Sequence, residues 1–389
     1  MPLAHDSFTF DTVPSVRFGA GCLDQIGLIA GETVGKTCLV VTDRGLVATG
    51  IVDQALAALH SCGIHCEVFD QVEADPFEAT VLSAVAQARA LGCNSIIGLG
   101  GGSSLDVAKL VAYLAGTGEQ ISDIYGVGLA LGKRLPLVLV PTTSGTGSEV
   151  TPIAIVTTPN QEKMGVVSPA LLPDVALLDP LLTLGLPANI TAATGIDAMV
   201  HAIEAYASAS PNNNPISRTL ALQALRLLGG ALLRGVHQGD DLEARSDLLI
   251  GSMLAGQAFA NSPVAAVHAL AYPIGGHFKI PHGLSNALVL PHVLRFNIDT
   301  APDAYAQMAS AAFPKLADVR KAERAAAFCN CLEGLSRSCN LPQRLRDVGI
   351  AREALPMMAR DAMNQTRLLI NNPRPVTEAD ALSIYEAAW

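Results

Sequence analysis

The chain has 389 residues, which is long enough for two domains that each bury a core. Its formal net charge of −10 argues against nucleic-acid binding, because that function requires a basic surface. Half of the residues are hydrophobic, yet we find no uninterrupted apolar run of the roughly 18 residues that a membrane-spanning helix needs, so we expect no membrane partner.

The rest of the composition indicates a cytoplasmic protein. The first residues lack a basic stretch followed by an apolar one, so we predict no secretory signal. Eight cysteines lie scattered without paired zinc-type spacing, and we interpret them as reduced cytosolic thiols. Charged residues make up only 15% of the chain, and we expect surplus apolar surface to be buried in a homodimer or a larger homo-oligomer.

Strand-like and helix-like segments alternate through the first half of the chain. Apolar runs that end in polar or glycine-rich turns predict strands at 36–42, 66–70, 94–100, 135–143, 154–158 and 174–179. Helical patterns separate the first four of these strands. This alternation predicts a parallel sheet with right-handed crossovers.

Strand-like runs disappear after about residue 187, and long helical patterns replace them. These patterns cover 190–208, 215–236, 242–260, 286–297, 301–314, 320–339 and 377–388. We therefore predict an α/β domain at 1–187 and an all-helical domain at 188–389.

Three glycines, Gly100, Gly101 and Gly102, stand where the third predicted strand ends and a helix begins. Glycine lets the backbone approach a ligand closely, and the free N–H groups at a helix N-terminus bind phosphate. The segment matches neither the G-x-G-x-x-G dinucleotide pattern nor a Walker loop. A tight turn without a ligand is therefore the alternative interpretation.

A second turn, 141–151, follows the next strand and is rich in hydroxyl side chains. The hydroxyl groups that can reach ribose or phosphate oxygens belong to Thr142, Thr143, Ser144 and Thr146. Because ligands of open parallel sheets bind at the carboxyl ends of neighbouring strands, the two turns together predict a nucleotide site.

Asp43 ends the first predicted strand. A carboxylate at this place can accept hydrogen bonds from an adenine ribose and repels a 2′-phosphate, which favours NAD over NADP. The neighbouring Arg44 weakens this inference. The alternative is that Asp43 caps the helix that follows.

Four side chains in the second half have the chemistry of a metal site. Asp197 and His201 are four residues apart, so a helix would place both on one face. His268 lies in an apolar segment, and His282 follows it. Three imidazoles and one carboxylate suit a divalent ion such as Fe²⁺ or Zn²⁺. Taken one at a time, each side chain has an ordinary alternative as a core or surface residue.

The chain resembles the iron-containing (group III) alcohol dehydrogenase family nearly from end to end. The resemblance is carried by His268 and by GGGSSLDVAK at 100–109, PTTSGTGSEVT at 141–151, GIDAMVHAIEAY at 195–206 and PHG at 281–283. It implies an N-terminal Rossmann-like α/β domain and an all-α C-terminal domain, the fold shared with dehydroquinate synthases. It also implies NAD and a divalent metal as cofactors, with Fe²⁺ preferred to Zn²⁺.

The resemblance assigns both sites residue by residue. The residues that match the family's metal ligands are Asp197, His201, His268 and His282. The residues that match positions around the dinucleotide are Asp43, Gly101, Gly102, Ser103, Asp106, Thr142, Thr143, Ser148 and Lys163. Gly100 belongs to the same glycine turn and is a further candidate.

One position departs from the family pattern. Many relatives read H-x-x-x-H-P where this chain has His268-Ala-Leu-Ala-Tyr272-Pro273, so Tyr272 replaces a histidine that is often given a proton-relay role. The ordinary pKa of tyrosine, about 10, makes its hydroxyl a poor relay unless the metal lowers it. Tyr272 is one catalytic candidate, and His277 is a second that either lines the pocket or faces solvent.

These assignments predict a metal-dependent oxidoreductase that interconverts a small alcohol and its aldehyde or ketone with NAD(H). The alternative is a reductase of a small oxo-acid, of the maleylacetate reductase or hydroxyacid dehydrogenase type. A dehydroquinate synthase is disfavoured, because the motif regions are poor in basic residues beyond Lys163 and Lys279. A non-catalytic scaffolding protein would leave the intact motifs unexplained.

Overall fold

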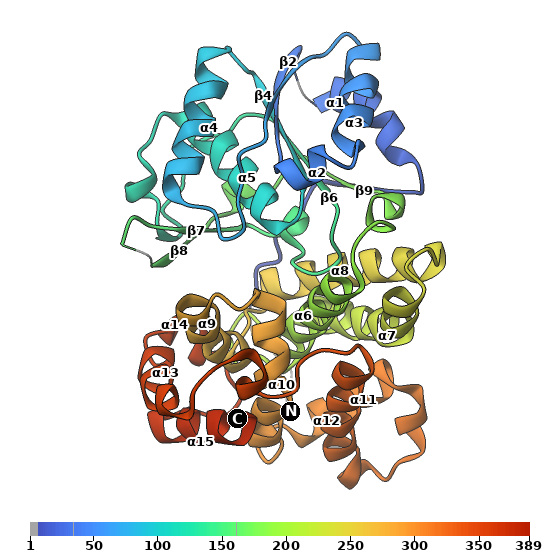
Figure 1. The fold of residues 1–389 in the computed structure, drawn as a ribbon, viewed down its shortest axis with the longest axis vertical. Coiled ribbons are helices and arrows are strands. Elements are labelled where there is room, and N and C mark those ends of the chain that lie inside the picture. Colours follow the sequence, from blue (N-terminus) through green and yellow to red (C-terminus); the bar gives the residue numbers. More distant parts are fainter. Residues whose placement is uncertain (1–6, 34, 161) are drawn as a thin grey trace. The chain divides into compact units, whose positions relative to one another are not determined.

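The computed structural model describes residues 7–33, 35–160 and 162–389. Within them the chain forms two compact units, an α/β unit and a helical unit (Figure 1). The α/β unit is Asp11–Leu184, and the helical unit is Gly185–Trp389 together with the described residues before Asp11. The predicted fold class, an α/β half followed by an all-helical half, is confirmed.

The two units divide between Leu184 and Gly185, close to the predicted end of the first domain at residue 187. The start of the chain differs from the prediction, since it groups with the helical unit. The backbone N–H and C=O of Thr9 both bond to the side chain of Asn212, at 2.9 Å each. No hydrophobic pattern in the sequence marks this attachment, because it depends on one amide side chain.

A six-stranded parallel sheet forms the centre of the α/β unit, in the order β1-β9-β6-β4-β2-β3. Its central strands read as continuous runs of valine, isoleucine and leucine, which is typical of strands that are buried on both faces. The strands are β1 (Ser15–Phe18), β2 (Thr37–Val41), β3 (His65–Phe69), β4 (Ser95–Gly100), β6 (Leu137–Pro141) and β9 (Val175–Leu178).

Helices cover both faces of this sheet (Figure 1). Side chains alternate between the faces along each strand. In β2, Leu39 and Val41 pack in the core that includes α4 and α5, whereas Cys38 and Val40 pack in the core that includes α1 and α3. The helices are α1 (Ile26–Thr33), α3 (Ile51–Ser61), α4 (Glu78–Ala90) and α5 (Gly102–Thr117).

A second, three-stranded sheet has the order β5-β8-β7. The predicted strand 154–158 belongs to this sheet and not to the parallel one. Its partner at 163–167 was not predicted, because Lys163 and Gly165 interrupt any apolar run there. The strands are β5 (Gly126–Val127), β7 (Ile153–Thr157) and β8 (Lys163–Val167).

The helical unit is arranged around α6, which packs against α7, α8 and α10. All seven predicted helical segments are present, and their ends lie within a few residues of the predicted ends. The helices are α6 (Ala188–Ala207), α7 (Pro215–His237), α8 (Leu242–Asn261), α9 (Ala266–Phe278), α10 (His282–Asn297), α11 (Pro302–Ala312), α12 (Lys321–Ser338), α13 (Leu355–Ala362), α14 (Thr366–Leu369) and α15 (Glu378–Ala388).

One of these helices, α7, is long and apolar enough to cross a membrane by length and composition. Its most apolar window has a mean hydropathy of 1.2, and 44% of that window is buried inside the protein. It packs against α6 and α8. A core helix of a soluble protein passes the same test, so α7 is weak evidence for a membrane partner.

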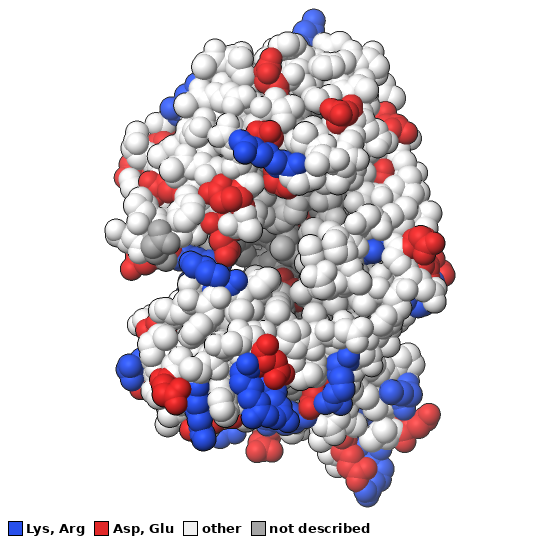
Figure 2. Space-filling model, viewed as in Figure 1, with Lys and Arg blue, Asp and Glu red and all other residues white. Residues whose placement is uncertain are grey.

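Charged side chains are sparse on the face shown in Figure 2. Acidic and basic groups are interspersed there, and most of the visible surface is uncharged. This distribution agrees with the low charged fraction of 15%. It offers no extended basic patch on this face of the kind that nucleic acid requires.

Candidate metal centre and cofactor turns

Four predicted side chains of the helical unit bring their ligand atoms together. The atoms, one each from Asp197, His201, His268 and His282, lie within 4.8 Å of one another. Asp197 and His201 come from one face of α6, His268 comes from α9, and His282 begins α10. Three of the side chains are buried, and that of His282 is 37% exposed. The cluster is therefore buried but open on one side.

Gly283 allows α10 to begin directly against α6. A Cβ atom at this position would lie 2.4 Å from the carbonyl oxygen of Ala193 and 3.3 Å from the Cβ of Asp197. Contacts near 2.4 Å to backbone atoms force something to shift. The glycine of the PHG segment thus places His282 next to Asp197.

Two of the imidazole rings of the cluster, those of His201 and His268, are stacked, and the ring of His282 is tilted by 46° to that of His268. The ring of His201 lies 4.3 Å from that of Phe259, at 21°, and 4.9 Å from that of His268, at 19°. The ring of His268 lies 5.3 Å from that of His282. Side chains locked by packing in this way are held ready for a ligand.

Asp197 supplies a buried negative charge. Burial alone would raise the pKa of this carboxyl, but three neighbouring imidazoles and the amide of Asn286 outweigh it, so that the pKa of Asp197 is lowered. The carboxylate is therefore ionised at neutral pH. A buried anion that faces three nitrogen ligands favours a cation between them.

Asn286, which the sequence analysis did not single out, touches three of the four candidate ligands. Its Nδ2 donates to Oδ1 of Asp197 at 2.6 Å and lies 3.3 Å from Nε2 of both His268 and His282. Its own Oδ1 is buried without a hydrogen-bond partner among the described residues. A buried amide that touches two imidazole nitrogens and a carboxylate and keeps an orphaned oxygen fits a site for a borderline divalent ion.

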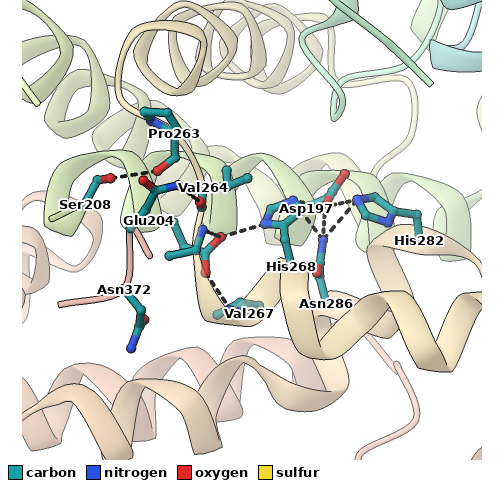
Figure 3. A network of polar contacts seen from close by, with 12 residues as sticks. Asp197, Glu204, Ser208, Pro263, Val264, Val267, His268, His282, Asn286 and Asn372 are labelled. Carbon is teal, nitrogen blue, oxygen red and sulfur yellow. Dashed lines mark hydrogen bonds and ion pairs between the residues drawn. The ribbon is translucent and has the colours of Figure 1, made fainter. Parts of the chain in front are cut away.

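Glu204 is a second residue that the sequence analysis missed. It lies on α6 one turn after His201 and is buried, and its Oε2 accepts a hydrogen bond from Nδ1 of His268 at 2.6 Å (Figure 3). The sequence held a signal for it, since a glutamate three residues after a candidate ligand lies on the same helix face.

In the α/β unit, the two predicted turns lie against each other. Gly100 ends β4 with a φ of 152°, a conformation that strongly favours glycine. A Cβ atom on Gly102, the first residue of α5, would lie 2.7 Å from Cγ2 of Thr146 in the second turn. Gly101 precedes α5, and Ser103 lies in its first turn.

Thr142 and Thr143 follow β6 beside the glycine turn. The backbone N–H of Thr142 donates to the carbonyl of Gly100 at 3.0 Å, and the side chain of Thr142 is buried. A Cβ atom on Gly101 would lie 3.6 Å from Cγ2 of Thr143, which is partly exposed. The prediction that both turns meet at one edge of the sheet is confirmed; the nucleotide itself stays a prediction.

Asp106 and Ser148 bond to each other. Ser148 Oγ donates to one carboxylate oxygen of Asp106 at 2.6 Å, and the backbone N–H of Ile155 donates to the other at 3.0 Å. Burial raises the pKa of Asp106, and the nearby Lys109 opposes this effect. In this structure the Asp106 carboxylate shapes the second turn and holds β7 to α5.

Lys109 and Glu149 were not predicted as site residues, although they lie in the motif segments 100–109 and 141–151. The Nζ of Lys109 is fully buried and donates to the carbonyl of Ile153 at 2.8 Å and to Oγ1 of Thr151 at 3.2 Å. Burial lowers the pKa of Lys109 to about 8 and raises the pKa of Glu149 to about 7. The Nζ of Lys109 also lies 3.7 Å from Oδ1 of Asp106, and its charge acts on Glu149.

Asp43 caps the helix that follows it, which was the alternative interpretation of this residue. Its Oδ1 accepts a hydrogen bond from the N–H of Leu46 at 3.0 Å, at the start of α2 (Arg44–Val47). A Cβ atom on Gly100 would lie 3.6 Å from its Oδ2, so the second oxygen adjoins the glycine turn. Lys163 lies in β8 and bonds to Oδ1 of Asp75 at 2.6 Å.

Tyr272 lies near the metal-site cluster, with its ring 6.1 Å from that of His282. Burial raises the pKa of its hydroxyl, and the positive charge of Arg367 opposes this rise. His277, the other catalytic candidate, has a side chain that is 45% exposed, and its Nε2 lies 2.5 Å from Oδ2 of Asp361. This pair joins α9 to α13 at the surface.

Two family profiles match consecutive parts of the chain. The profile for iron-containing alcohol dehydrogenase covers residues 14–180, and that for the C-terminal part of the Fe-containing alcohol dehydrogenase family covers residues 191–389. The chain belongs to the iron-containing alcohol dehydrogenase family. Because the family is described as iron-containing, its members are expected to have metal ligands, and the cluster of three histidines and one aspartate fits this expectation.

Relatives of this alcohol dehydrogenase match over nearly its full length. Long-chain-alcohol dehydrogenase 1 of Geobacillus thermodenitrificans is 42% identical over 97% of this chain and 95% of its own. The crystal structure of a 1,3-propanediol oxidoreductase has a TM-score of 0.95 and 35% identity, covering 98% of this chain and 100% of that one. Sulfoacetaldehyde reductase from Bifidobacterium kashiwanohense, in complex with NAD⁺, has a TM-score of 0.88 and 28% identity over 98% of both chains.

Family membership confirms the predicted resemblance, fold class and enzyme class. The chain is an oxidoreductase of the alcohol dehydrogenase type that acts on CH–OH groups. The family also implies a metal, as predicted.

Proposed function

We propose that this alcohol dehydrogenase interconverts a small alcohol and its aldehyde or ketone by hydride transfer to NAD⁺ and, in reverse, from NADH. The observation that carries the proposal is the buried cluster of four ligand atoms within 4.8 Å of one another. Asp197, His201, His268 and His282 would hold the divalent metal. Fe²⁺ is the first candidate, because the family is defined by iron, and Zn²⁺ is the second.

A metal bound here would act as a Lewis acid toward the substrate oxygen. The protein's part is to prepare the site. Asp197 keeps an ionised carboxylate inside the helical unit, and stacked rings hold the imidazoles in place. The partial exposure of His282 leaves a side by which a small molecule can enter.

We propose NAD as the cofactor, bound at the carboxyl edge of the parallel sheet. The glycine turn gives close backbone approach and the N-terminus of α5 for the diphosphate. Oδ2 of Asp43 adjoins that turn and would repel a 2′-phosphate. The residues proposed to line this site are Asp43, Gly100, Gly101, Gly102, Ser103, Asp106, Thr142, Thr143, Ser148 and Lys163. That the related sulfoacetaldehyde reductase binds NAD⁺ supports the choice.

An alcohol or aldehyde is the proposed substrate, since relatives are named for alcohols. The relative named for 1,3-propanediol supports a small one, whereas the relative named for long-chain alcohols supports a longer one. One observation favours the alternative, a reductase of a small oxo-acid. Arg367 is exposed, and its positive charge acts on the hydroxyl of Tyr272, which lies beside the metal-site cluster. An exposed guanidinium at this place can bind an anionic group on the substrate.

We further propose a cytoplasmic homodimer or larger homo-oligomer. The support is the apolar composition together with exposed apolar side chains around β5, where Val127, Leu129 and Leu131 are 70%, 52% and 84% exposed. A mass at or above twice that of the 40.4 kDa chain, measured by light scattering, is the expected result.

The test is NADH formation by protein that has been loaded anaerobically with Fe²⁺, or separately with Zn²⁺. The substrate panel holds short primary alcohols, diols and matched hydroxy acids. Activity that requires metal and disappears with chelator supports the proposal, and the hydroxy acids decide between the two substrate classes. Tight NADH binding with no turnover on any substrate and either metal would count against an alcohol dehydrogenase.

A further inference from the structure

The carboxylate of Glu204 connects α6 to the start of α9 through three hydrogen bonds (Figure 3). Its Oε2 accepts from the backbone N–H of Ala265 at 2.9 Å and from Nδ1 of His268 at 2.6 Å. Its Oε1 accepts from the backbone N–H of Val267 at 2.6 Å. Glu204 is 5% exposed, so all three bonds lie in the protein interior.

These bonds satisfy groups that α9 cannot satisfy by itself. The first N–H groups of a helix have no partner within it, and the N-cap residue of α9, Ala265, has no side chain that could accept from them. Glu204 from α6 takes this role across the helix interface. Its negative charge at the N-terminus of α9 is also favoured by the helix dipole.

The third bond determines which nitrogen of His268 carries the proton. An ionised carboxylate can only accept hydrogen bonds, so Nδ1 of His268 must donate to it. In a neutral imidazole the other nitrogen then keeps its lone pair. That nitrogen, Nε2, is the one that lies 4.0 Å from Oδ1 of Asp197 and 3.3 Å from Nδ2 of Asn286. The lone pair therefore points toward the metal-site cluster.

We propose that Glu204 is a positioning residue of the metal centre, which fixes the tautomer and ring orientation of His268 so that Nε2 is ready to bind the metal. The proposal rests on the function proposed above, in which His268 is a metal ligand. Carboxylates that bond to ligand histidines commonly account for a 10- to 100-fold range in metal affinity or activity.

The rival interpretation is that Glu204 only fastens α9 to α6. Ser208 offers a matched control, because its Oγ donates to the carbonyl of Pro263 at 2.8 Å and so fastens the same α8–α9 connection to the same helix (Figure 3). It makes no bond of this kind to His268. Removing it loosens the attachment while leaving the Glu204–His268 pair in place.

The experiment compares Glu204→Gln, Ser208→Ala and the unmodified protein. Zn²⁺ affinity is measured by competition with a chelator, and the visible absorption of bound Co²⁺ reports the ligand geometry. We expect Glu204→Gln to weaken Zn²⁺ binding by about 10- to 100-fold and to change the Co²⁺ spectrum. Ser208→Ala should keep both near the values of the unmodified protein, and NADH affinity should be unchanged in all three.

Each outcome decides something. Equal Zn²⁺ affinity in Glu204→Gln and the unmodified protein, or equal losses in Glu204→Gln and Ser208→Ala, would overturn the positioning role and leave the proposed function standing. An unmodified protein that binds no divalent ion would overturn both. If Glu204→Gln does not fold, ¹⁵N NMR of the metal-free, unmodified protein replaces it: a proton on Nδ1 of His268 is expected, and a proton on Nε2 with Nδ1 free contradicts the inference.

Discussion

Tyr272 lies close to the metal-site cluster, and its protonation state limits what it can do there. Burial raises the pKa of its hydroxyl, and the positive charge of Arg367 opposes this only in part. The hydroxyl is therefore neutral at pH 7. A neutral group of raised pKa can bind and orient a substrate, but it is a poor proton acceptor.

We accordingly expect Tyr272→Phe to lower kcat by less than about tenfold, because acid–base residues usually contribute 10²- to 10⁴-fold. Metal content and NADH affinity should stay unchanged. Steady-state kinetics at several pH values would measure the effect, with Tyr206→Phe as the control, since Tyr206 bonds to Gln307 elsewhere in the same unit. A loss of a hundredfold or more at full metal content would instead make Tyr272 a proton-transferring residue.

Glu149 makes the stability of the α/β unit depend on pH. Burial raises its pKa from the ordinary 4.5 to about 7, although a backbone N–H and Lys109 oppose the rise. Between these values the folded state binds a proton that the unfolded state has lost. The contribution of the protonated Glu149 side chain to the free energy of unfolding is thus fully present below pH 4.5 and is lost as the pH rises through 7.

Glu149→Gln cannot ionise, so it should escape this loss. The difference in the free energy of unfolding, Glu149→Gln minus the unmodified protein, should increase by on the order of 1–3 kcal/mol from pH 4.5 to pH 7. Denaturant unfolding at the two pH values measures the difference. Glu32→Gln, at a side chain that is 76% exposed, serves as the control and should show little change with pH. A constant difference between Glu149→Gln and the unmodified protein would contradict the raised pKa.

At the scale of single elements, the sequence predicted those whose residues repeat with a clear period. The spacing of Asp197 and His201 predicted one face of α6, and the apolar runs predicted the central strands. Helix α9 was not predicted, because Pro273 and two glycines interrupt its helical pattern. Its position depends on Glu204, which belongs to another helix.

The candidate sites divide in the same way. The four metal-site residues were predictable because each is a strong ligand type in a quoted motif. Asn286 was not, since an amide has many ordinary roles and only the fold brings it to the cluster. Glu204 had a signal in its helical spacing from His201, but only the fold shows that it bonds to His268. Lys109 and Glu149 were not predicted, because what sets them apart is that both are buried. Charged residues in a sequence are expected at the surface, so their burial could not be inferred.

Gly283 links the packing of two helices to the geometry of the metal centre. Alanine at this position would place its Cβ 2.4 Å from the carbonyl oxygen of Ala193, so the start of α10 must move away from α6. We expect Gly283→Ala to weaken Zn²⁺ binding and to lower the Tm, because His282 begins the displaced helix. Chelator competition and thermal unfolding measure the two effects.

Gly276→Ala is the matched control for this change. It lies in α9, and a Cβ atom there would meet nothing within 4 Å, so alanine should favour the helix without disturbing its neighbours. Its Zn²⁺ affinity should equal that of the unmodified protein. Unchanged Zn²⁺ affinity in Gly283→Ala would show that close packing of α10 on α6 is not what places His282.

At the scale of the whole molecule, the candidate sites lie on different compact units. All four metal-site residues belong to the helical unit, whereas the glycine and hydroxyl turns belong to the α/β unit. A ligand that binds only the folded state stabilises it, and a local opening is suppressed most where the ligand's contacts are broken. Each ligand should therefore protect a different part of the chain.

Hydrogen exchange can test this division directly. Zn²⁺ alone should slow exchange most strongly in α6, α9 and the first turn of α10, and NAD⁺ alone should do so in the start of α5 and in residues 142–148. The reason is that Zn²⁺ would bridge three helices, while the dinucleotide would bind the ends of two strands. Strong protection of the α/β unit by Zn²⁺ alone would contradict the metal assignment, and protection by NAD⁺ confined to the helical unit would contradict the cofactor assignment. The two assignments can thus fail separately, although a complete reaction requires both.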